Sequence, residues 1–232
     1  METSVQATAS TTLDRPAPAV PQGADKPFAS PLFQEVATRI DRTTRRVILE
    51  PGPTSTGTLQ LLQGKRCRLL VADAALALSA LSEQTLSAGQ LEQKLKMLIF
   101  DAGAEQVDTV LCWDLLNYLS PPLLTAFAAR LIDIMTPTGV MHAYIHSAHA
   151  TMPQHPQRYS AVGTDLVTRL DRDNAARKAP RYSAWDLEKH GIGLRVERSM
   201  LLRNGMQEYL LRADSTHAGP RDVKPLYRKR QR

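Results

Sequence analysis

Apolar residues recur along most of the chain in two spacings, one typical of strands and one typical of helices. Four short apolar runs each end in an acid, and these acids are Glu50, Asp73, Asp101 and Asp114. Between the runs, apolar residues recur every three or four positions, the spacing of an amphipathic helix. Strands that alternate with helices predict a mostly parallel sheet covered on both faces.

The individual elements follow from these spacings. The predicted strands lie at residues 45–50, 66–73, 96–101, 107–114 and 140–146. The predicted helices lie at residues 32–44, 56–64, 74–97 with a break near 87–89, 120–135 and 183–191. Two further apolar runs meet at Asn204-Gly205, the strongest short signal for an antiparallel hairpin. The expected fold is therefore a Rossmann-like α/β fold with a seven-stranded, mostly parallel sheet that ends in a C-terminal antiparallel hairpin.

The two ends of the chain differ in composition from its body. Residues 1–27 are rich in Ala, Ser, Thr and Pro and lack a periodic apolar pattern, so a disordered tail is expected there. Residues 213–232 hold six basic residues against two acids, which is +4 of the net charge of +6. We therefore expect a folded domain over residues 28–212 between a disordered tail and a basic tail.

Composition also limits the compartment. The first residues are polar, and the longest apolar-rich window, residues 69–81, includes Asp73 and is too short to span a membrane. The two cysteines, Cys67 and Cys112, lie in different predicted strands, which fits buried reduced thiols better than a disulfide or a metal pair. A cytoplasmic protein without a membrane segment is the expectation.

The acids at the strand ends predict where a ligand would bind. In open parallel sheets, ligands bind at the carboxyl ends of the strands. All four acids fall at those ends. Their regular placement is more informative than any one of them alone.

Five segments, in this order, resemble the class I S-adenosylmethionine-dependent methyltransferases. They are "VILEPGPTSTG", "LLVAD", "VDTVLCWDLLNYL", "MTPTGVMHAYIH" and "ERSMLLRNGMQEYLLR", and the resemblance extends over residues 32–212. The resemblance implies S-adenosyl-L-methionine as the cofactor. It also implies a methyl acceptor, either a small molecule or a protein, which the sequence does not identify.

The resemblance assigns a role to each matching residue. Glu50 and Gly52 match the acid and the first glycine of the cofactor loop. Asp73 matches the acid that binds the ribose, whose two hydroxyls one carboxylate can accept together. Asp101 matches the region that meets the adenine, and Trp113 lies where the methyl group is expected.

The cofactor loop departs from the family pattern. Thr54 and Thr56 stand where the second and third glycines are expected. A threonine disfavours positive φ and places a Cβ and a hydroxyl where the backbone would meet the ligand. Thr54 could instead donate its hydroxyl to a cofactor carboxylate, so we keep it among the predicted cofactor-binding residues.

Two candidates for a catalytic role are Asp114 and His146. His146 ends a predicted strand, and a general base there would suit an acceptor that loses a proton. A metal site is not expected, because His142 and His146 would lie roughly 13 Å apart along a strand. Plainer roles stay open: Asp73 as a helix N-cap, and Glu50 with Gly52 as an ordinary strand-end turn.

Three functions are compatible with these patterns. The first is a methyltransferase that uses S-adenosyl-L-methionine. The second is a catalytically inactive methyltransferase-like module that binds a partner, which the glycine-poor loop and the tails favour. A nicotinamide oxidoreductase is a weaker third, because the chain lacks G-x-G-x-x-G.

Two segments outside the core could contact other molecules. The basic tail could contact nucleic acid. Residues 147–180 form a long, irregular connection, and "MPQHPQRY" within it, residues 152–159, is the insertion expected to face the substrate.

Overall fold

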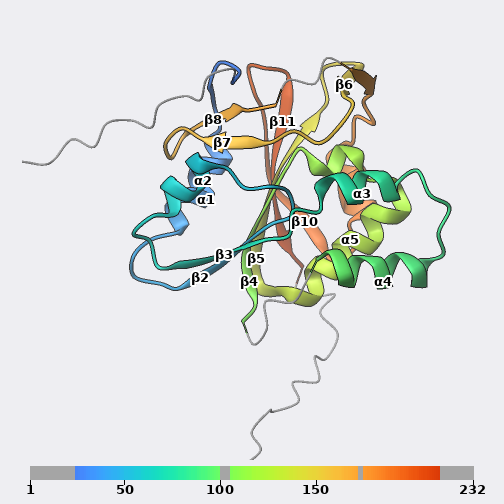
Figure 1. The fold of residues 1–232 in the computed structure, drawn as a ribbon, viewed down its shortest axis with the longest axis horizontal. Coiled ribbons are helices and arrows are strands. Elements are labelled where there is room, and N and C mark those ends of the chain that lie inside the picture. The colour runs from blue at the N-terminus through green and yellow to red at the C-terminus, as the bar shows by residue number, and fades with distance from the viewer. Residues whose placement is uncertain (1–23, 100–104, 172–174, 215–232) are drawn as a thin grey trace, which may run out of the picture.

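A six-stranded sheet crosses the centre of the molecule, as the computed structural model of residues 24–99, 105–171 and 175–214 shows (Figure 1). Its strands are Arg46–Glu50 (β2), Cys67–Val71 (β3), Val107–Trp113 (β4), Met135–His146 (β5), Leu194–Leu201 (β10) and Met206–Ala213 (β11). Their order in the sheet is β10-β11-β5-β4-β2-β3. β2, β3, β4 and β5 pair in parallel, whereas β11 is antiparallel to both β5 and β10.

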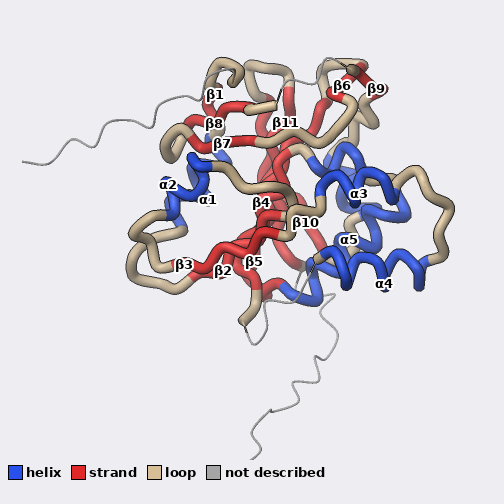
Figure 2. Tube along the Cα trace, in the orientation of Figure 1, coloured by secondary structure: helices blue, strands red, loops and turns tan. Residues whose placement is uncertain are grey.

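Helices connect the parallel strands, as the sequence predicts (Figure 2). They are Pro31–Arg39 (α1), Thr56–Leu62 (α2), Ala75–Leu81 (α3), Ala88–Leu98 (α4), Pro121–Ile134 (α5) and Ala184–His190 (α6), with a short 3-10 helix at Leu115–Tyr118 (η1). α5 begins with two prolines, which are compatible with a first helical turn because its N–H groups have no partner within the helix. The prediction of an α/β fold is therefore confirmed.

Alternation along the central strands divides the core into two layers. Leu49 and Val110 pack with α3, α4 and α5 on one face of the sheet. Ile48 and Leu111, their neighbours in sequence, pack with α1 on the other face. Because successive side chains of a strand point to opposite faces, strands that are apolar throughout must be covered on both.

Seven strands were predicted, and the one at residues 96–101 is wrong for its first three residues. They form the last turn of α4, and Leu91, Leu95 and Ile99 are buried at intervals of four. A capping box between Ser87 and Gln90 starts this helix, so the apolar pattern continues the helical period. Six strands make up the central sheet in the described residues.

The segment predicted as irregular, residues 147–180, contains four short strands. Tyr159–Ala161 (β7) and Leu166–Arg169 (β8) form a small sheet with Phe28–Ala29 (β1), while Thr151–Pro153 (β6) pairs with Ala176–Lys178 (β9). Figure 1 shows these strands above the carboxyl ends of the central parallel strands. We call residues 151–171 and 175–178 the cap.

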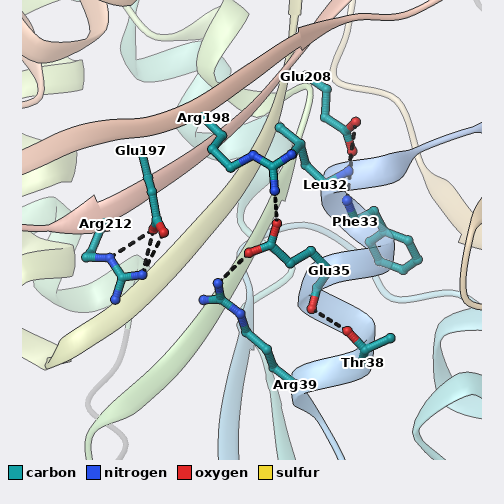
Figure 3. A network of polar contacts seen from close by, with 9 residues as sticks. All are labelled: Leu32, Phe33, Glu35, Thr38, Arg39, Glu197, Arg198, Glu208 and Arg212. Carbon is teal, nitrogen blue, oxygen red and sulfur yellow. Dashed lines mark hydrogen bonds and ion pairs between the residues drawn. The ribbon is translucent and has the colours of Figure 1, made fainter.

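A buried carboxylate attaches α1 to the closing hairpin. Glu208 on β11 accepts hydrogen bonds from the backbone N–H groups of Leu32 (3.1 Å) and Phe33 (2.8 Å), as Figure 3 shows. Ser30 Oγ also donates to Glu208 Oε1 (2.5 Å), and His142 Nε2 lies 2.8 Å from the same oxygen. Glu208 therefore occupies the N-terminus of α1, where a negative charge is favourable.

Several predictions fall partly or wholly outside the described residues. The nucleic-acid contact was predicted for residues 213–232, of which all beyond residue 214 lie outside, as does most of the predicted disordered tail. Asp25, near the end of that tail, is described and lies against β8, because Arg169 Nε donates to Asp25 Oδ2 (2.7 Å). In the described part of the chain, none of the helices is long and apolar enough to cross a membrane.

Candidate functional site

The carboxyl edge of the central sheet brings together three of the predicted site residues. Glu50 ends β2, Trp113 ends β4, and Asp73 follows the end of β3. Because these strands are parallel neighbours, their carboxyl ends meet at one edge. Trp113 Nε1 donates a hydrogen bond of 2.6 Å to Glu50 Oε1. The sequence predicted the edge, but not this contact.

Glu50 is fully buried, and only part of its hydrogen-bonding capacity is used. Burial raises its pKa to about 7, although Thr54 and Trp113 act in the opposite direction. Glu50 Oε2 and Thr54 Oγ1 have no hydrogen bond of normal geometry to any described residue. An unpaired buried polar group is costly, so these two atoms mark a place where a polar ligand would compensate.

Two residues at this edge hold backbone conformations that favour glycine. Asp73 has φ 49° and Trp113 has φ 50°. The pairing of β4 with β5 shifts register between Leu111 and Trp113, while the Trp113 side chain stays on the face of the sheet that carries Leu111. Strained residues of this kind cluster at functional sites.

Asp73 does not act as the N-cap of α3. The N-cap position is Ala74, without a side-chain hydrogen bond, and Asp73 is exposed to solvent. Ala74 N donates to Pro51 O (2.7 Å), so the turn that carries Asp73 lies beside the loop after β2. The plainer role considered for Asp73 is thereby excluded, and its carboxylate is open to a ligand.

The loop after β2 and the start of α2 hold two glycines with different surroundings. Ser55 caps α2 by accepting from Thr58 N (3.1 Å). At Gly52 a Cβ would meet only Ala75 Cβ, at an ordinary 3.6 Å. At Gly57 a Cβ would lie 2.1 Å from Ala161 O of β7. The start of α2 is therefore packed against the cap, and Gly57 is small for that reason.

Asp114 is buried behind the cap. It accepts from Gln157 N (3.1 Å), and the Tyr159 hydroxyl lies 3.5 Å from its Oδ2. Burial raises the pKa of Asp114 to about 7, against these hydrogen bonds and the charge of Arg169. Asp114 thus contacts the cap through Gln157 and Tyr159. Tyr159 also lines the cavity described next.

His146 lines a cavity of about 370 Å³ between the cap, the N-terminal segment and the turn after β10. It is 6% exposed, and its Nε2 has no hydrogen-bond partner among the described residues. Burial lowers its pKa to about 4, and electrostatic interactions with Arg169 and His149 act in the same direction. At neutral pH the ring is uncharged and can accept or donate one hydrogen bond.

Two further residues considered in the sequence analysis, Asp101 and His142, lie away from the sheet edge or outside the described residues. Asp101 lies outside the described residues. His142 is bound to Glu208 inside the core, and the described residues contain no cluster of three or more side chains that could hold a metal ion.

Sequence reasoning did not find the cap residues that complete this region. Tyr159 stacks on Trp113 with ring centroids 5.6 Å apart and an angle of 18° between planes. Arg169 forms an ion pair with Asp25 (2.6 Å). Both come from the segment predicted as irregular. Tyr159 ends the insertion expected to face the substrate, residues 152–159, whereas Arg169 lies outside it.

Comparisons with known proteins give structural similarity but no sequence family. No family model matches the chain, and no curated protein matches its sequence. The chain is similar to the solved 1,6-didemethyltoxoflavin-N1-methyltransferase of Burkholderia thailandensis with bound S-adenosylhomocysteine, at 14% identity over 78% of each chain and a TM-score of 0.42.

Two further solved structures are similar to a comparable degree. A methyltransferase from Streptomyces caelestis has 11% identity and a TM-score of 0.42, with 78% of this chain and 94% of that chain covered. A glycopeptide N-methyltransferase in complex with S-adenosyl-L-methionine has 14% identity and a TM-score of 0.40, with 78% and 92% covered. At such identities and TM-scores, the function has to be argued from the residues of this chain.

Proposed function

We propose that this protein is an S-adenosyl-L-methionine-dependent methyltransferase with a small-molecule acceptor. One observation carries the proposal. The buried Glu50, with an unpaired oxygen, lies at the same sheet edge as Asp73 and Trp113, which are held in left-handed conformations. A strained, incompletely satisfied edge of a parallel sheet is typical of a ligand site.

The donors and acceptors at this edge fit the cofactor. The exposed carboxylate of Asp73 can accept from both hydroxyls of a ribose. Glu50 Oε2 can accept from an ammonium or a hydroxyl group, and Thr54 Oγ1 can donate to a carboxylate. Gly52 leaves room for close approach of a ligand to the backbone.

When bound, S-adenosyl-L-methionine supplies an electrophilic methyl group on a sulfonium. The leaving group is neutral, so the protein contributes mainly position and exclusion of water. The cap covers the edge, and Tyr159 with Trp113 forms an aromatic wall there. His146 Nε2, which is uncharged at neutral pH, accepts a hydrogen bond from the hydroxyl or amine of the acceptor and so orients it. Because a ring with a pKa of about 4 is a weak base, the proton that the acceptor loses passes to solvent.

Calorimetry of the full chain with S-adenosyl-L-methionine and S-adenosylhomocysteine tests the proposal. We expect binding at micromolar to millimolar concentration and about tenfold weaker binding for Asp73→Asn, the loss expected for one strong ligand hydrogen bond. Asp133→Asn, which also changes an exposed aspartate, is the matched control and keeps wild-type affinity. No binding of either compound at millimolar concentration would refute the proposal.

A second candidate is a methyltransferase-like module that no longer binds the cofactor. The observation in its favour is the contact of Gly57 with β7, because the start of α2 is covered by Ala161 O. A module of this kind would bind a partner and neither cofactor compound. The calorimetry above therefore separates the two candidates.

A further inference from the structure

The cavity beside His146 has a polar end and an apolar wall. Phe28, Tyr159 and Met206 contribute to the apolar wall, and Lys26, His146 and Arg169 contribute polar groups. Its volume of about 370 Å³ is at the lower end of the range for small-molecule pockets. It is built from segments far apart in the sequence, so it exists only in the folded protein.

Basic side chains outnumber acidic ones among the residues that line the cavity. Asp25 is the one acid among the residues that line it, and Asp25 is paired with Arg169 (2.6 Å). Lys26 is exposed and adds a charge that Asp25 does not balance. Burial is the main cause that lowers the pKa of His146, and the charge of Arg169 acts in the same direction, so a cation lies near the buried ring. A negatively charged ligand group would be attracted to the polar end.

The apolar wall favours a flat ligand. The Tyr159 ring lies parallel to Trp113, with 18° between the planes, and Trp113 reaches Glu50 at the sheet edge. The Phe28 ring meets Tyr144 edge-on at 5.7 Å, which fixes its position on the other side. Tyr159 is 1% exposed and also contacts Tyr144, with ring centroids 5.3 Å apart, so the half-buried Phe28 ring is the one on which a flat ligand can stack. A ring held in place by another ring is rigid, so a ligand stacks on it at low entropic cost.

His146 provides the specific contact. Its side chain is more than nine-tenths buried, and its Nε2 has no partner among the described residues. An unpaired buried nitrogen in a cavity wall is satisfied by a ligand hydroxyl or N–H.

We propose that this cavity is the acceptor site and that the acceptor is a small aromatic acid, with its carboxylate toward Lys26 and Arg169 and a hydroxyl or amine at His146 Nε2. This assignment rests on the proposed methyltransferase function. It adds the chemical class of the acceptor, which the sheet edge alone does not indicate.

Equilibrium titration of the full chain with para-hydroxybenzoate and para-hydroxybenzamide tests the charge preference. The two probes have nearly the same shape, and only the first is an anion. We expect the acid to bind more tightly than the amide. Lys26→Ala should weaken the acid about fivefold and leave the amide unchanged, the loss expected for one partly exposed ion pair.

Lys94→Ala is the matched control, because Lys94 is an exposed lysine on α4 and does not line the cavity. His146→Gln should weaken both probes, with the fold checked by circular dichroism. Equal binding of acid and amide, equal effects of the two lysine variants, or no binding at millimolar concentration would each overturn the inference.

Titration of the same samples with S-adenosylhomocysteine separates this inference from the proposed function. If S-adenosylhomocysteine binds and the acid does not, the inference fails and the methyltransferase proposal stands. If the acid binds with the expected variant pattern and S-adenosylhomocysteine does not, the anion-binding cavity stands and the methyltransferase proposal fails.

Discussion

Asp73 combines an unfavourable backbone conformation with an exposed side chain. Its φ of 49° would suit glycine, and its carboxylate neither caps α3 nor makes any other hydrogen bond that would compensate the fold for the strain. Left-handed conformations cost non-glycine residues about 1 kcal/mol. Binding of the proposed cofactor by this carboxylate would offset that cost.

The strain at Asp73 predicts that Asp73→Gly changes the stability of the fold little and weakens cofactor binding. Glycine relieves the strain but increases the entropy of the unfolded chain, so the free energy of unfolding should change by less than about 1 kcal/mol. Asp73→Ala keeps the strain without the carboxylate and should be less stable than Asp73→Gly by about 1 kcal/mol. Urea denaturation measures the stabilities, and calorimetry with S-adenosylhomocysteine should show weaker binding for both variants. Greater stability of the alanine variant would contradict the strain argument.

Glu50 predicts a pH dependence of stability. Its pKa in the folded protein is about 7, above the ordinary value of 4.5, so the folded state binds the proton more tightly than the unfolded state. This contribution is complete below the unfolded pKa and is lost as the pH rises through the folded pKa.

Glu50→Gln removes this dependence. Its stability relative to wild type should therefore rise by about 3 kcal/mol between about pH 4 and about pH 8. Urea denaturation across that range measures the difference, and Glu83→Gln, at an exposed acid, is the control. A difference that is constant with pH would show that Glu50 does not hold its proton in the fold.

At the scale of elements, two glutamates of the same hairpin have very different surroundings (Figure 3). Glu208 is fully buried at the N-terminus of α1 and accepts from Leu32 N and Phe33 N. Glu197 is partly exposed and pairs with Arg212 at the surface (2.7 Å). Loss of a buried carboxylate leaves its donors unsatisfied, whereas loss of a surface ion pair exposes its partner to water.

Glu208→Ala should therefore lower the free energy of unfolding by about 3 kcal/mol, and Glu197→Ala by less than about 1 kcal/mol. Urea denaturation at neutral pH measures both. The pKa of Glu208 is lowered overall, because His142, Ser30 and Leu32 outweigh the burial that would raise it. Its contribution is present above the unfolded pKa and is lost as the pH falls through the folded value. Similar losses for the two variants would mean that α1 does not depend on this carboxylate.

The same scale explains which elements could be predicted from sequence. α5, α6 and the β10–β11 hairpin carry their signals locally, in the prolines after Ser120, the capping box at Ser183 and the turn at Asn204-Gly205. The strands of the cap are two to four residues long and pair with distant partners, such as Phe28 with Val167. No local spacing marks them. The sequence predicts a strand at residues 96–98 because a short apolar run does not show a helical period by itself. In the structure these residues continue α4.

In the candidate site, too, local features could be predicted from sequence and contacts between distant residues could not. Acids at the ends of parallel strands can be placed from sequence, because the topology fixes which edge they share. The contact of Glu50 with Trp113 joins residues 63 positions apart and depends on the left-handed turn at Trp113. The roles of Tyr159 and Arg169 depend on the cap. Geometry of this kind arises only from tertiary packing.

At the scale of the whole molecule, the central sheet and the small sheet of β1, β7 and β8 are stabilised by different contacts. The central sheet has a buried apolar layer on each face. The small sheet of β1, β7 and β8 rests on the N-terminal segment, where Thr168 Oγ1 donates to Asp25 O (2.6 Å) and Arg169 pairs with the Asp25 carboxylate (2.6 Å). Its strands are only two to four residues long, although Tyr159, Ala161 and Val167 are buried in the layer that contains α1. Opening a small peripheral sheet of this kind costs less free energy than opening the central sheet. A cap that opens without unfolding the sheet would admit an acceptor to the cavity beside His146.

Amide hydrogen exchange of the full chain tests this arrangement. Amides of β7 and β8 should exchange faster than those of β4 and β5, because they need only local opening. Asp25→Asn weakens the pair with Arg169, which is about one-third exposed, and should speed exchange in β1 and β8 by up to about fivefold without changing β4. Asp133→Asn, an exposed change on α5, is the control and should alter neither group. If Asp25→Asn instead sped exchange equally in the cap and in the central sheet, the two parts would open as one unit, and entry through a separately opening cap would be ruled out.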